Sequence, residues 1–376
     1  MPYQQLRYYQ AGTFVVGNRL LPPEQRSVQA RMDRSNTLTC GHRACRGCGE
    51  ALGARYALDA AMRATKGQMI AANATGCLEV FSTPFPESSW QLPWIHSLFG
   101  NAPAVASGVA AALRAKGRSD VRVVGQAGDG GTVDIGFACL SGTFERNDDV
   151  LFICYDNEAY MNTGVQRSAA TPPAARTANT KPLEGHPGNE FGQGKNVPLI
   201  AIAHEIPYVA TATVAEPRDL EAKVERAMEL RGARYIHVFV PCPLGWGSAS
   251  KDTIRLARLV KETGLFPVFE AEHGDVVSVS KIRRRVPVTE YLKLQRRYAH
   301  LFGEHGRPDV IERLQAGADR NVERFGLLSD SDDAAALPGA ATDLAGESVD
   351  EPLRPVDTEA ESNLMRLLSE THGSPR

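Results

Sequence analysis

Short hydrophobic runs alternate with helical patterns between about residues 37 and 326. Three of the runs are rich in β-branched and aromatic residues, which favours buried strands: VRVVGQ (121–126), VLFICYDN (150–157) and RYIHVFVPC (234–242). Before the first run, APAVASGVAAALRA (102–115) groups four side chains on one helical face: Val105, Val109, Ala112 and Leu113. This alternation predicts an α/β fold, with a mostly parallel central sheet flanked by helices.

The two ends of the chain depart from this pattern. Residues 1–36 carry aromatics and arginines without a helical or strand period, which indicates an extended N-terminal arm. Residues 327–376 are acidic, rich in small residues and punctuated by proline, which is typical of a disordered tail. Within the tail, residues 357–370 predict a short amphipathic helix. We therefore expect one folded domain, 37–326, between two less ordered ends.

Composition excludes several classes of protein. A chain of 376 residues can bury a sizeable core without disulfides, and its formal net charge of -2 provides no general attraction for nucleic acid or an anionic membrane. The N-terminus lacks the pattern of a secretory signal, and no run is apolar for long enough to span a bilayer. Seven cysteines in such a chain indicate reduced thiols or metal ligands, so we expect a cytoplasmic protein.

Polar residues and glycines follow two of the predicted strands. Gly128, Asp129 and Gly130 come after the first, and Asn157 comes after the second. If these strands are parallel neighbours joined by a helix over 132–147, the polar side chains face one crevice at the carboxyl ends of the strands. Glycine lets a backbone approach a diphosphate, and hard oxygen ligands suit Mg²⁺. The pattern predicts a magnesium and diphosphate site, although a lone Gly-Asp-Gly would indicate only a turn.

Several segments resemble, in the same order, segments of the beta subunit of pyruvate:ferredoxin oxidoreductase and related 2-oxoacid:ferredoxin oxidoreductases. They are GHRACRGCGEAL, ATGCLEVFSTPFP, PWIHSLFGNAPAVASG, GDGGTVDIG, YDNEAYMNTGVQRS and PCPLGW. The resemblance runs from about residue 38 to about 325 and implies a thiamine-diphosphate-binding fold with the cofactor at a subunit interface. It implies magnesium ligands at Asp129, Asn157 and the carbonyl of Ala159, and a diphosphate cradle at Gly128 and Gly130. Asn162 would lie near the reactive end of the cofactor, although a plain turn residue is nearly as good an interpretation.

Cysteines cluster in CGHRACRGCGE (40–50). A local CxxC pair and two remote thiolates can close a tetrahedral site when the fold brings them together. The resemblance assigns that site to a [4Fe-4S] cluster held by Cys45, Cys48, Cys77 and Cys242, with Cys77 also packing against thiamine. Two alternatives stay open: a plant-type [2Fe-2S] site that includes Cys40, and a structural zinc site on the same four thiolates. We expect Cys139 and Cys154, in apolar runs, to be small core residues.

The resemblance implies oxidative decarboxylation of a 2-oxoacid, with pyruvate favoured, and with coenzyme A as the acceptor of the acyl group. Electrons would pass through the cluster to ferredoxin or a similar acceptor. Alpha, gamma and delta subunits are the implied partners, and the alpha subunit would supply a glutamate without which this chain is inactive. Two alternatives remain: a non-redox thiamine-dependent decarboxylase or transketolase-like subunit, and a non-catalytic zinc-binding assembly module. We interpret His96 as structural and the basic run 281–287 as a solvated face.

Overall fold

The computed structural model describes residues 37–39, 41–83, 88–183 and 185–328. The arm predicted for residues 1–36 and the helix predicted for 357–370 lie outside the described residues, and so does Cys40.

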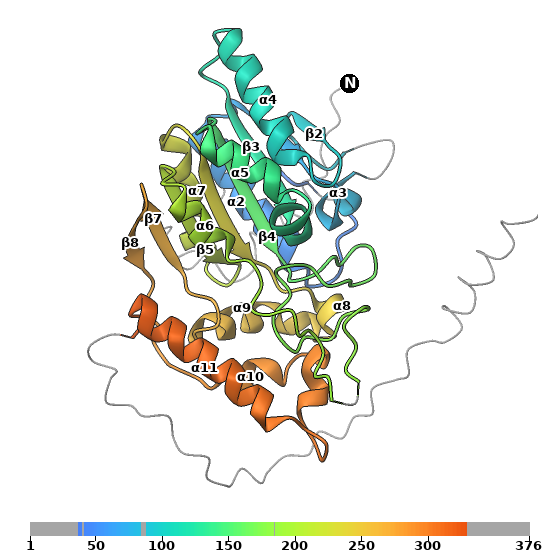
Figure 1. Cartoon of the computed structure of the whole chain (residues 1–376). Coiled ribbons are helices and arrows are strands. Elements are labelled where there is room, and N and C mark those ends of the chain that lie inside the picture. Colours follow the sequence, from blue (N-terminus) through green and yellow to red (C-terminus); the bar gives the residue numbers. More distant parts are fainter. Residues whose placement is uncertain (1–36, 40, 84–87, 184, 329–376) are drawn as a thin grey trace, which may run out of the picture. The chain divides into compact units, whose positions relative to one another are not determined.

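A twisted sheet forms the centre of the described chain (Figure 1). Within the described residues it has eight strands in the order β2-β1-β3-β4-β6-β5-β7-β8. The parallel strands are β1 (Met69–Asn73), β2 (Trp94–His96), β3 (Arg122–Gly128), β4 (Val150–Asp156), β5 (Tyr208–Thr213) and β6 (Arg234–Phe239). An antiparallel hairpin of β7 (Phe269–Glu272) and β8 (Asp275–Val279) extends one edge. The predicted fold class is confirmed, and the three predicted strands are β3, β4 and β6.

Helices cover both faces of the sheet (Figure 1). On one face, α2 (Gly49–Ala64) and α7 (Pro217–Glu229) pack on side chains such as Leu151 and Ile153 of β4. On the other face, α5 (Phe137–Glu145) and α6 (Val197–Ala203) pack on Phe152 and Cys154. Every residue of β4 is buried, which explains why this strand reads as a continuous apolar run.

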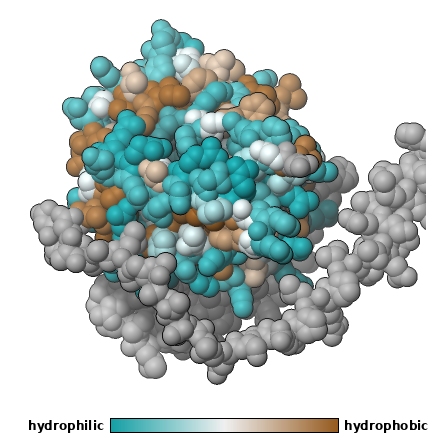
Figure 2. All heavy atoms as spheres, turned by 60° about the horizontal axis from the view of Figure 1, so that its bottom comes forward, coloured by the Kyte–Doolittle hydropathy of each residue, from teal (hydrophilic) through white to brown (hydrophobic). Residues whose placement is uncertain are grey.

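The C-terminal part of the described chain is mostly helical. It contains α8 (Pro243–Trp246), α9 (Thr253–Glu262), α10 (Val288–Leu292), a 3-10 helix (Arg296–Leu301) and α11 (Pro308–Phe325). Residues of α9, α10 and α11 belong to the same core cluster as α2 and α7. Among the described residues, no helix is long and apolar enough to cross a membrane. Figure 2 shows polar and apolar side chains intermixed on the face turned forward from the bottom of Figure 1, which is ordinary for a protein surface.

Two sequence expectations are corrected. The helix predicted over 132–147 forms over most of its length as α5, but its start belongs to a π-helical turn (Gly130–Asp134), in which Ile135 donates its main-chain N–H to the carbonyl of Gly130. Helix α4 (Ala102–Ala115) forms where predicted and packs Val105, Val109 and Leu113 on the sheet, but Ala112 is exposed. Ala106 is the fully buried residue of that face instead.

Gly125 in β3 lies where α4 packs closely on the sheet. A Cβ at this position would lie 3.3 Å from the Cβ of Ala106 and 2.6 Å from the buried ring of Phe152. The ring is enclosed on all sides, so an added methyl group has no room.

We predict that Gly125→Ala lowers the free energy of unfolding by about 1 to 3 kcal/mol, because it overpacks this contact. Gly108→Ala in α4 is the matched control: a Cβ there meets nothing within 4 Å, so it should be neutral or stabilise the helix by up to about 1 kcal/mol. Urea unfolding monitored by circular dichroism measures both. Equal stability of the two variants would contradict the close packing of α4 on β3.

Candidate functional site

One pocket lies at the carboxyl ends of β1, β3 and β4. Strands β3 and β4 are parallel neighbours with Gly128 paired to Tyr155, so the residues that follow them emerge side by side. The pocket includes every residue that the sequence assigned to thiamine diphosphate and magnesium: Cys77, Gly128, Asp129, Gly130, Asn157, Ala159 and Asn162. It is completed by Glu50, Thr75, Gly76, Phe99, Gly131, Tyr160, Met161 and Thr163. The structure therefore brings the predicted cofactor residues together; their roles remain predictions.

Two buried oxygens in this pocket have no protein partner. Asp129 is 1% exposed and Asn157 is 5% exposed, and among the described residues neither Asp129 Oδ1 nor Asn157 Oδ1 accepts a hydrogen bond. The other polar atom of each side chain is engaged: the Ser168 hydroxyl donates to Asp129 Oδ2, and Asn157 Nδ2 donates to Glu50 Oε2 at 3.3 Å. Buried polar atoms rarely lack a partner. A carboxylate and an amide oxygen left free side by side fit a hard divalent cation.

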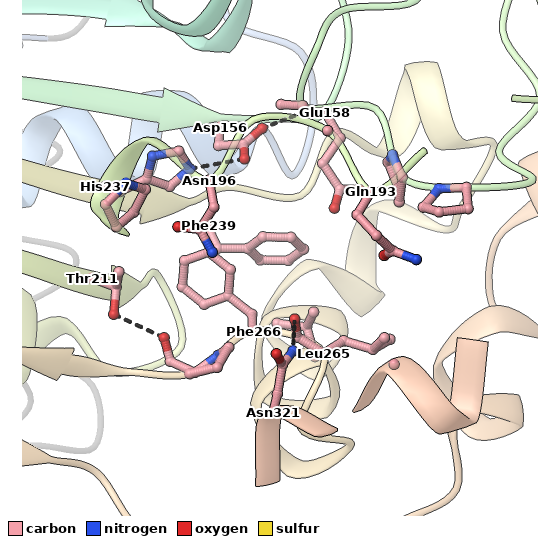
Figure 3. A pocket seen from close by; sticks show the side chains of 18 of the residues that line it. Asp156, Glu158, Gln193, Asn196, Thr211, His237, Phe239, Leu265, Phe266 and Asn321 are labelled. Atoms are coloured by element: carbon pink, nitrogen blue, oxygen red, sulfur yellow. Dashed lines mark hydrogen bonds and ion pairs between the residues drawn. The ribbon is translucent and has the colours of Figure 1, made fainter. Parts of the chain in front are cut away.

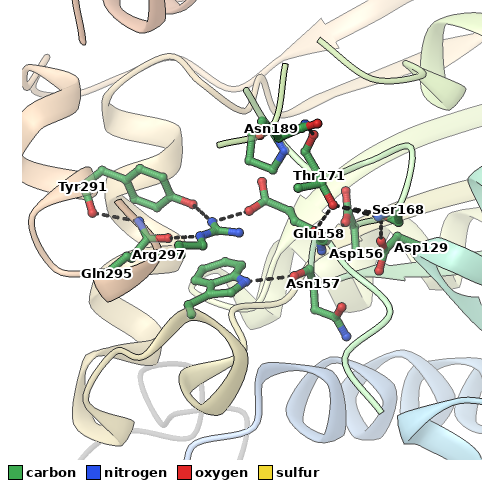
Figure 4. A network of polar contacts seen from close by, with 12 residues as sticks. Asp129, Asp156, Asn157, Glu158, Ser168, Thr171, Asn189, Tyr291, Gln295 and Arg297 are labelled. Atoms are coloured by element: carbon green, nitrogen blue, oxygen red, sulfur yellow. Dashed lines mark hydrogen bonds and ion pairs between the residues drawn. The ribbon is translucent and has the colours of Figure 1, made fainter. Parts of the chain in front are cut away.

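The segment Asn157–Ala159 has a strained backbone at its centre. Glu158 has φ of 67°, a left-handed conformation that costs about 1 to 2 kcal/mol for a residue with a side chain. Its main-chain N–H donates to Asp156 Oδ1 at 2.8 Å, and its carbonyl accepts from the Thr171 hydroxyl at 2.6 Å. Its carboxylate pairs with Arg297 (Figure 4). Contacts on all sides thus hold this turn between two of the predicted magnesium ligands.

Glycine at position 130 shapes the floor of the pocket. A Cβ there would lie 2.3 Å from the ring of Tyr160, so no side chain fits between the main chain and this ring. The Tyr160 hydroxyl in turn donates to Asp134 at 3.1 Å. This close approach leaves main chain, and no side chain, facing the pocket at Gly130, as the diphosphate assignment requires.

Glu50 is a site residue that the sequence reasoning missed. It lies in the first turn of α2, is 4% exposed and contacts Asn157. Burial raises its pKa to about 7, against a smaller opposing effect of the bond from Asn157. A carboxyl group with such a pKa can hold or release a proton near neutral pH. Its position two residues after Cys48, at the start of α2, does not reveal its contact with Asn157.

The four predicted cluster cysteines lie within electrostatic range of one another, and Cys77 also lines the pocket. Cys48 caps the N-terminus of α2, Cys242 caps α8, and Cys77 begins α3 (Cys77–Ser82), while Cys45 is exposed on the preceding loop. Burial raises the pKa of Cys48 to about 12 and of Cys242 to about 11. Burial also raises the pKa of Cys77, and the charges of Glu50 and the other three thiols raise it further. Mutual effects of this kind place all four sulfurs within one electrostatic neighbourhood.

Close main-chain packing brings the CxxC loop to α8. Gly49 donates its N–H to the carbonyl of Pro241 at 3.1 Å, and a Cβ on Gly49 would lie 2.7 Å from that same oxygen. Within the part of the chain that the structure describes, however, no three histidine, cysteine or carboxylate side chains already form a metal coordination sphere. The donor set is that of an iron–sulfur or zinc site, and Cys40 is outside the described residues.

The other residues singled out from the sequence lie outside the residues that line the pocket. Cys154 is fully buried and Cys139 is partly buried in α5. His96 is exposed and bonds to the Thr75 hydroxyl at 2.8 Å. In the run 281–287, Ile282 is buried, while Arg283 and Arg284 are exposed.

A second cavity of about 330 Å³ lies against the same loop (Figure 3). Asp156 and Glu158 line it, together with His237, which is held between the Tyr235 hydroxyl at 2.7 Å and Asp156 Oδ2 at 2.9 Å. Thr211, also in its wall, donates to the carbonyl of Pro267 at 2.8 Å. These lining groups have hydrogen-bond partners within the protein, whereas Asp129 Oδ1 and Asn157 Oδ1 in the smaller pocket have none among the described residues. The smaller pocket is therefore the better candidate for the functional site.

Comparison with known proteins defines the class and then the family. The model of the thiamine pyrophosphate enzyme C-terminal TPP binding domain matches residues 74–238, which carry most of the pocket. Together with the sheet, this match gives the class: the chain contains a thiamine-pyrophosphate-binding domain of the kind found in thiamine pyrophosphate enzymes. The chain is 50% identical over 291 residues to pyruvate synthase subunit PorB of Methanosarcina barkeri, covering 77% of this chain and 97% of that protein. The chain belongs to the family of PorB subunits of pyruvate synthase, the family that the sequence motifs indicated.

Other relatives broaden the comparison. PorB of Methanocaldococcus jannaschii is 47% identical over 307 residues, covering 80% of this chain and 100% of that protein. The ketoisovalerate oxidoreductase subunit VorB of Pyrococcus abyssi is 41% identical over 315 residues, covering 82% of this chain and 98% of that protein. Both the pyruvate and the ketoisovalerate enzymes therefore have subunits similar to this chain over most of its length.

We predict that Asp129→Asn stabilises the metal-free chain by about 1 kcal/mol at pH 8, because it removes a buried carboxylate whose Oδ1 has no partner. The same change should abolish the extra stability conferred by Mg²⁺ with thiamine diphosphate. Asn157→Asp is the matched variant: it should destabilise the metal-free chain and retain a response to Mg²⁺. Urea unfolding in EDTA and in Mg²⁺ measures both effects. A metal-free Asp129→Asn chain less stable than the parent would contradict the prediction.

Proposed function

We propose that the chain is the thiamine-diphosphate- and [4Fe-4S]-binding subunit of a 2-oxoacid oxidoreductase. Its reaction would be the oxidative decarboxylation of pyruvate or a related 2-oxoacid with coenzyme A to acyl-CoA and CO₂, with electrons passed to ferredoxin or a similar acceptor. One observation carries the proposal: the partnerless oxygens of Asp129 and Asn157 share a pocket with Cys77, which belongs to a group of four thiols. Membership of the PorB family supports the same reaction.

In the pocket, Asp129, Asn157 and the main-chain carbonyl of Ala159 would hold Mg²⁺, and Gly128 and Gly130 would contact the diphosphate. When bound, thiamine diphosphate supplies the electron sink that decarboxylation requires. Asn162 would lie near the reacting carbon. Glu50, which is buried in the same pocket and accepts a hydrogen bond from Asn157, would hold or release a proton at its carboxyl group near neutral pH.

The thiols Cys45, Cys48, Cys77 and Cys242 would hold the [4Fe-4S] cluster, which accepts and passes single electrons. Cys77 lines the proposed thiamine pocket and lies within electrostatic range of the other three thiols, so it would link the two centres. Main-chain N–H groups of Ala51 and Gly245 donate to the sulfurs of Cys48 and Cys242, both at 3.4 Å. Such bonds favour the thiolate form that a metal cluster needs.

Partner subunits would complete the site. Apolar side chains stand exposed on elements around the pocket: Val80 at 49%, Leu98 at 72% and Ile135 at 54%. Gly100, two residues after Leu98, packs against the main chain of Ile135, so two of these side chains lie on adjoining segments. Exposed apolar groups beside a cofactor pocket suit a subunit interface. An alpha subunit bound here would supply the glutamate that activates thiamine, with gamma and delta subunits completing the complex.

We predict about four iron atoms with matching acid-labile sulfide per chain after anaerobic purification, and loss of both in Cys77→Ser. Cys139→Ser is the matched control and should keep full iron content, because Cys139 lies in α5 away from the thiol group. The measurement is the content of iron, zinc and acid-labile sulfide per chain in the parent and in both variants. Zinc without iron would replace the proposal with a non-redox thiamine subunit or a structural zinc site, and two irons would favour a site that includes Cys40.

We also predict that the chain alone shows no 2-oxoacid turnover and gains it when assembled with its partner subunits. The assay is acyl-CoA formation with reduction of a viologen dye, using pyruvate and 2-oxoisovalerate in parallel. We expect a higher kcat/KM for pyruvate. Turnover by the isolated chain would contradict the predicted need for partner subunits. A higher kcat/KM for 2-oxoisovalerate would contradict the predicted preference for pyruvate.

A further inference from the structure

Arg297 is a buried cation far in sequence from the candidate site yet joined to it (Figure 4). It lies in the 3-10 helix Arg296–Leu301, and its side chain is 4% exposed. One nitrogen of its guanidinium pairs with Glu158, and Nε donates to Gln295 Oε1 at 2.8 Å. The flat face of the guanidinium lies 3.9 Å from the ring centre of Trp246. Charge, hydrogen bonds and stacking therefore fix its orientation.

Trp246 carries the connection to the thiol group. It is fully buried at the end of the short helix α8, whose N-terminal cap is Cys242. Its indole N–H donates to the main-chain carbonyl of Asn157 at 2.9 Å. The same indole thus touches Arg297 on its face and the predicted magnesium loop at its edge.

Glu158 connects Arg297 to the Asn157–Ala159 loop. It lies between Asn157 and Ala159, and its left-handed φ of 67° sets the direction of the peptide that follows. A return to an ordinary φ would rotate the carbonyl of Ala159 and the side chain of Asn157 relative to each other. The ion pair with Arg297 holds the Glu158 side chain, while Asp156 and Thr171 hold its main chain.

We propose that Arg297 is a positioning residue: through Glu158 and Trp246 it holds the Asn157–Ala159 loop in its ligand-presenting conformation and ties this loop to the helix that begins at Cys242. The inference rests on the proposed function, because it assigns the loop to the metal of that site. Arg297 contacts Glu158 and Trp246, and not the three predicted magnesium ligands, so it would act on those ligands through the geometry of the loop. A purely structural arginine would contribute to folding stability and leave metal affinity unchanged.

Affinity for Mn²⁺, used in place of Mg²⁺, separates these roles. The full chain is assembled with its partner subunits, stripped of metal with EDTA, and titrated with Mn²⁺ in the presence of thiamine diphosphate, with free Mn²⁺ followed by electron paramagnetic resonance. We expect Arg297→Gln and Glu158→Gln each to weaken Mn²⁺ binding about 10- to 100-fold, the usual effect of removing a residue that orients a metal ligand. The double variant Arg297→Gln/Glu158→Gln should bind Mn²⁺ no less tightly than the single variant with the lower affinity, because the two residues act as a unit.

Arg234→Gln is the matched control. Arg234 is also fully buried and also paired with a carboxylate, Asp149, but it begins β6 and so lies at the amino end of the sheet, opposite the pocket. This variant should lower the urea midpoint at least as much as Arg297→Gln and leave the Kd for Mn²⁺ unchanged. Trp246→Phe retains a ring under Arg297 but removes the bond to Asn157, and should weaken Mn²⁺ binding severalfold.

The outcomes are distinct. Folded Arg297→Gln with an unchanged Kd, or an equal loss of affinity in Arg234→Gln, overturns the positioning role while leaving the proposed function intact. If Arg297→Gln does not fold, Glu158→Gln and Trp246→Phe decide, and unchanged affinity in both overturns the inference. Absence of thiamine-dependent Mn²⁺ binding by the parent complex overturns the proposed function itself.

Discussion

The parallel pairing of β3 with β4 is the constraint on which the rest of the site depends. These strands lie in the middle of the sheet, are buried almost throughout, and end at Gly128 and Asp156. Because both carboxyl ends fall at the same edge, Asp129 and Asn157 emerge side by side with no loop to separate them. The π-helical turn after β3 and the left-handed turn after β4 then aim the main chain into the pocket. The rigid centre of the sheet therefore determines where the site residues lie, and the turns after β3 and β4 determine their final orientation.

That placement concentrates negative charge where the protein is least able to solvate it. Burial raises the pKa of Asp129 well above its ordinary range, and the neighbouring charge of Asp156 raises it further. Burial also raises the pKa of Glu158 to about 7, although Arg297 opposes this. A protein selected for stability alone would place apolar or amide groups here. The carboxylates are understandable as ligands and counter-charges for the cation that we propose binds here.

The sequence predicted the parts of this arrangement that depend on local pattern. Strands β3, β4 and β6 were predicted from their apolar runs. The polar residues after β3 and β4 were predicted to lie together because the carboxyl ends of parallel strands meet at one edge of the sheet. Glu50 and Arg297 could not be found in this way, because each meets the site through a contact between distant segments: Glu50 with Asn157, and Arg297 with Glu158. Ala106 lies three residues before Val109 and seven before Leu113, so it belongs to the predicted face of α4; its complete burial follows from the close approach to Gly125 opposite, which the sequence pattern does not show.

The thiol group and the thiamine pocket are coupled by the way α2 and α8 begin. Cys48 and Cys242 each cap a helix with sulfur, so main-chain N–H groups that helix geometry leaves free point at the two thiols. Those bonds lower the thiol pKa values, while burial and the charge of Glu50 raise them. Without a bound positive charge the second effect prevails, and the sulfurs stay protonated. The [4Fe-4S] cluster that we propose would resolve this conflict, since its metal ions would favour the thiolates for which the helix caps already provide donors.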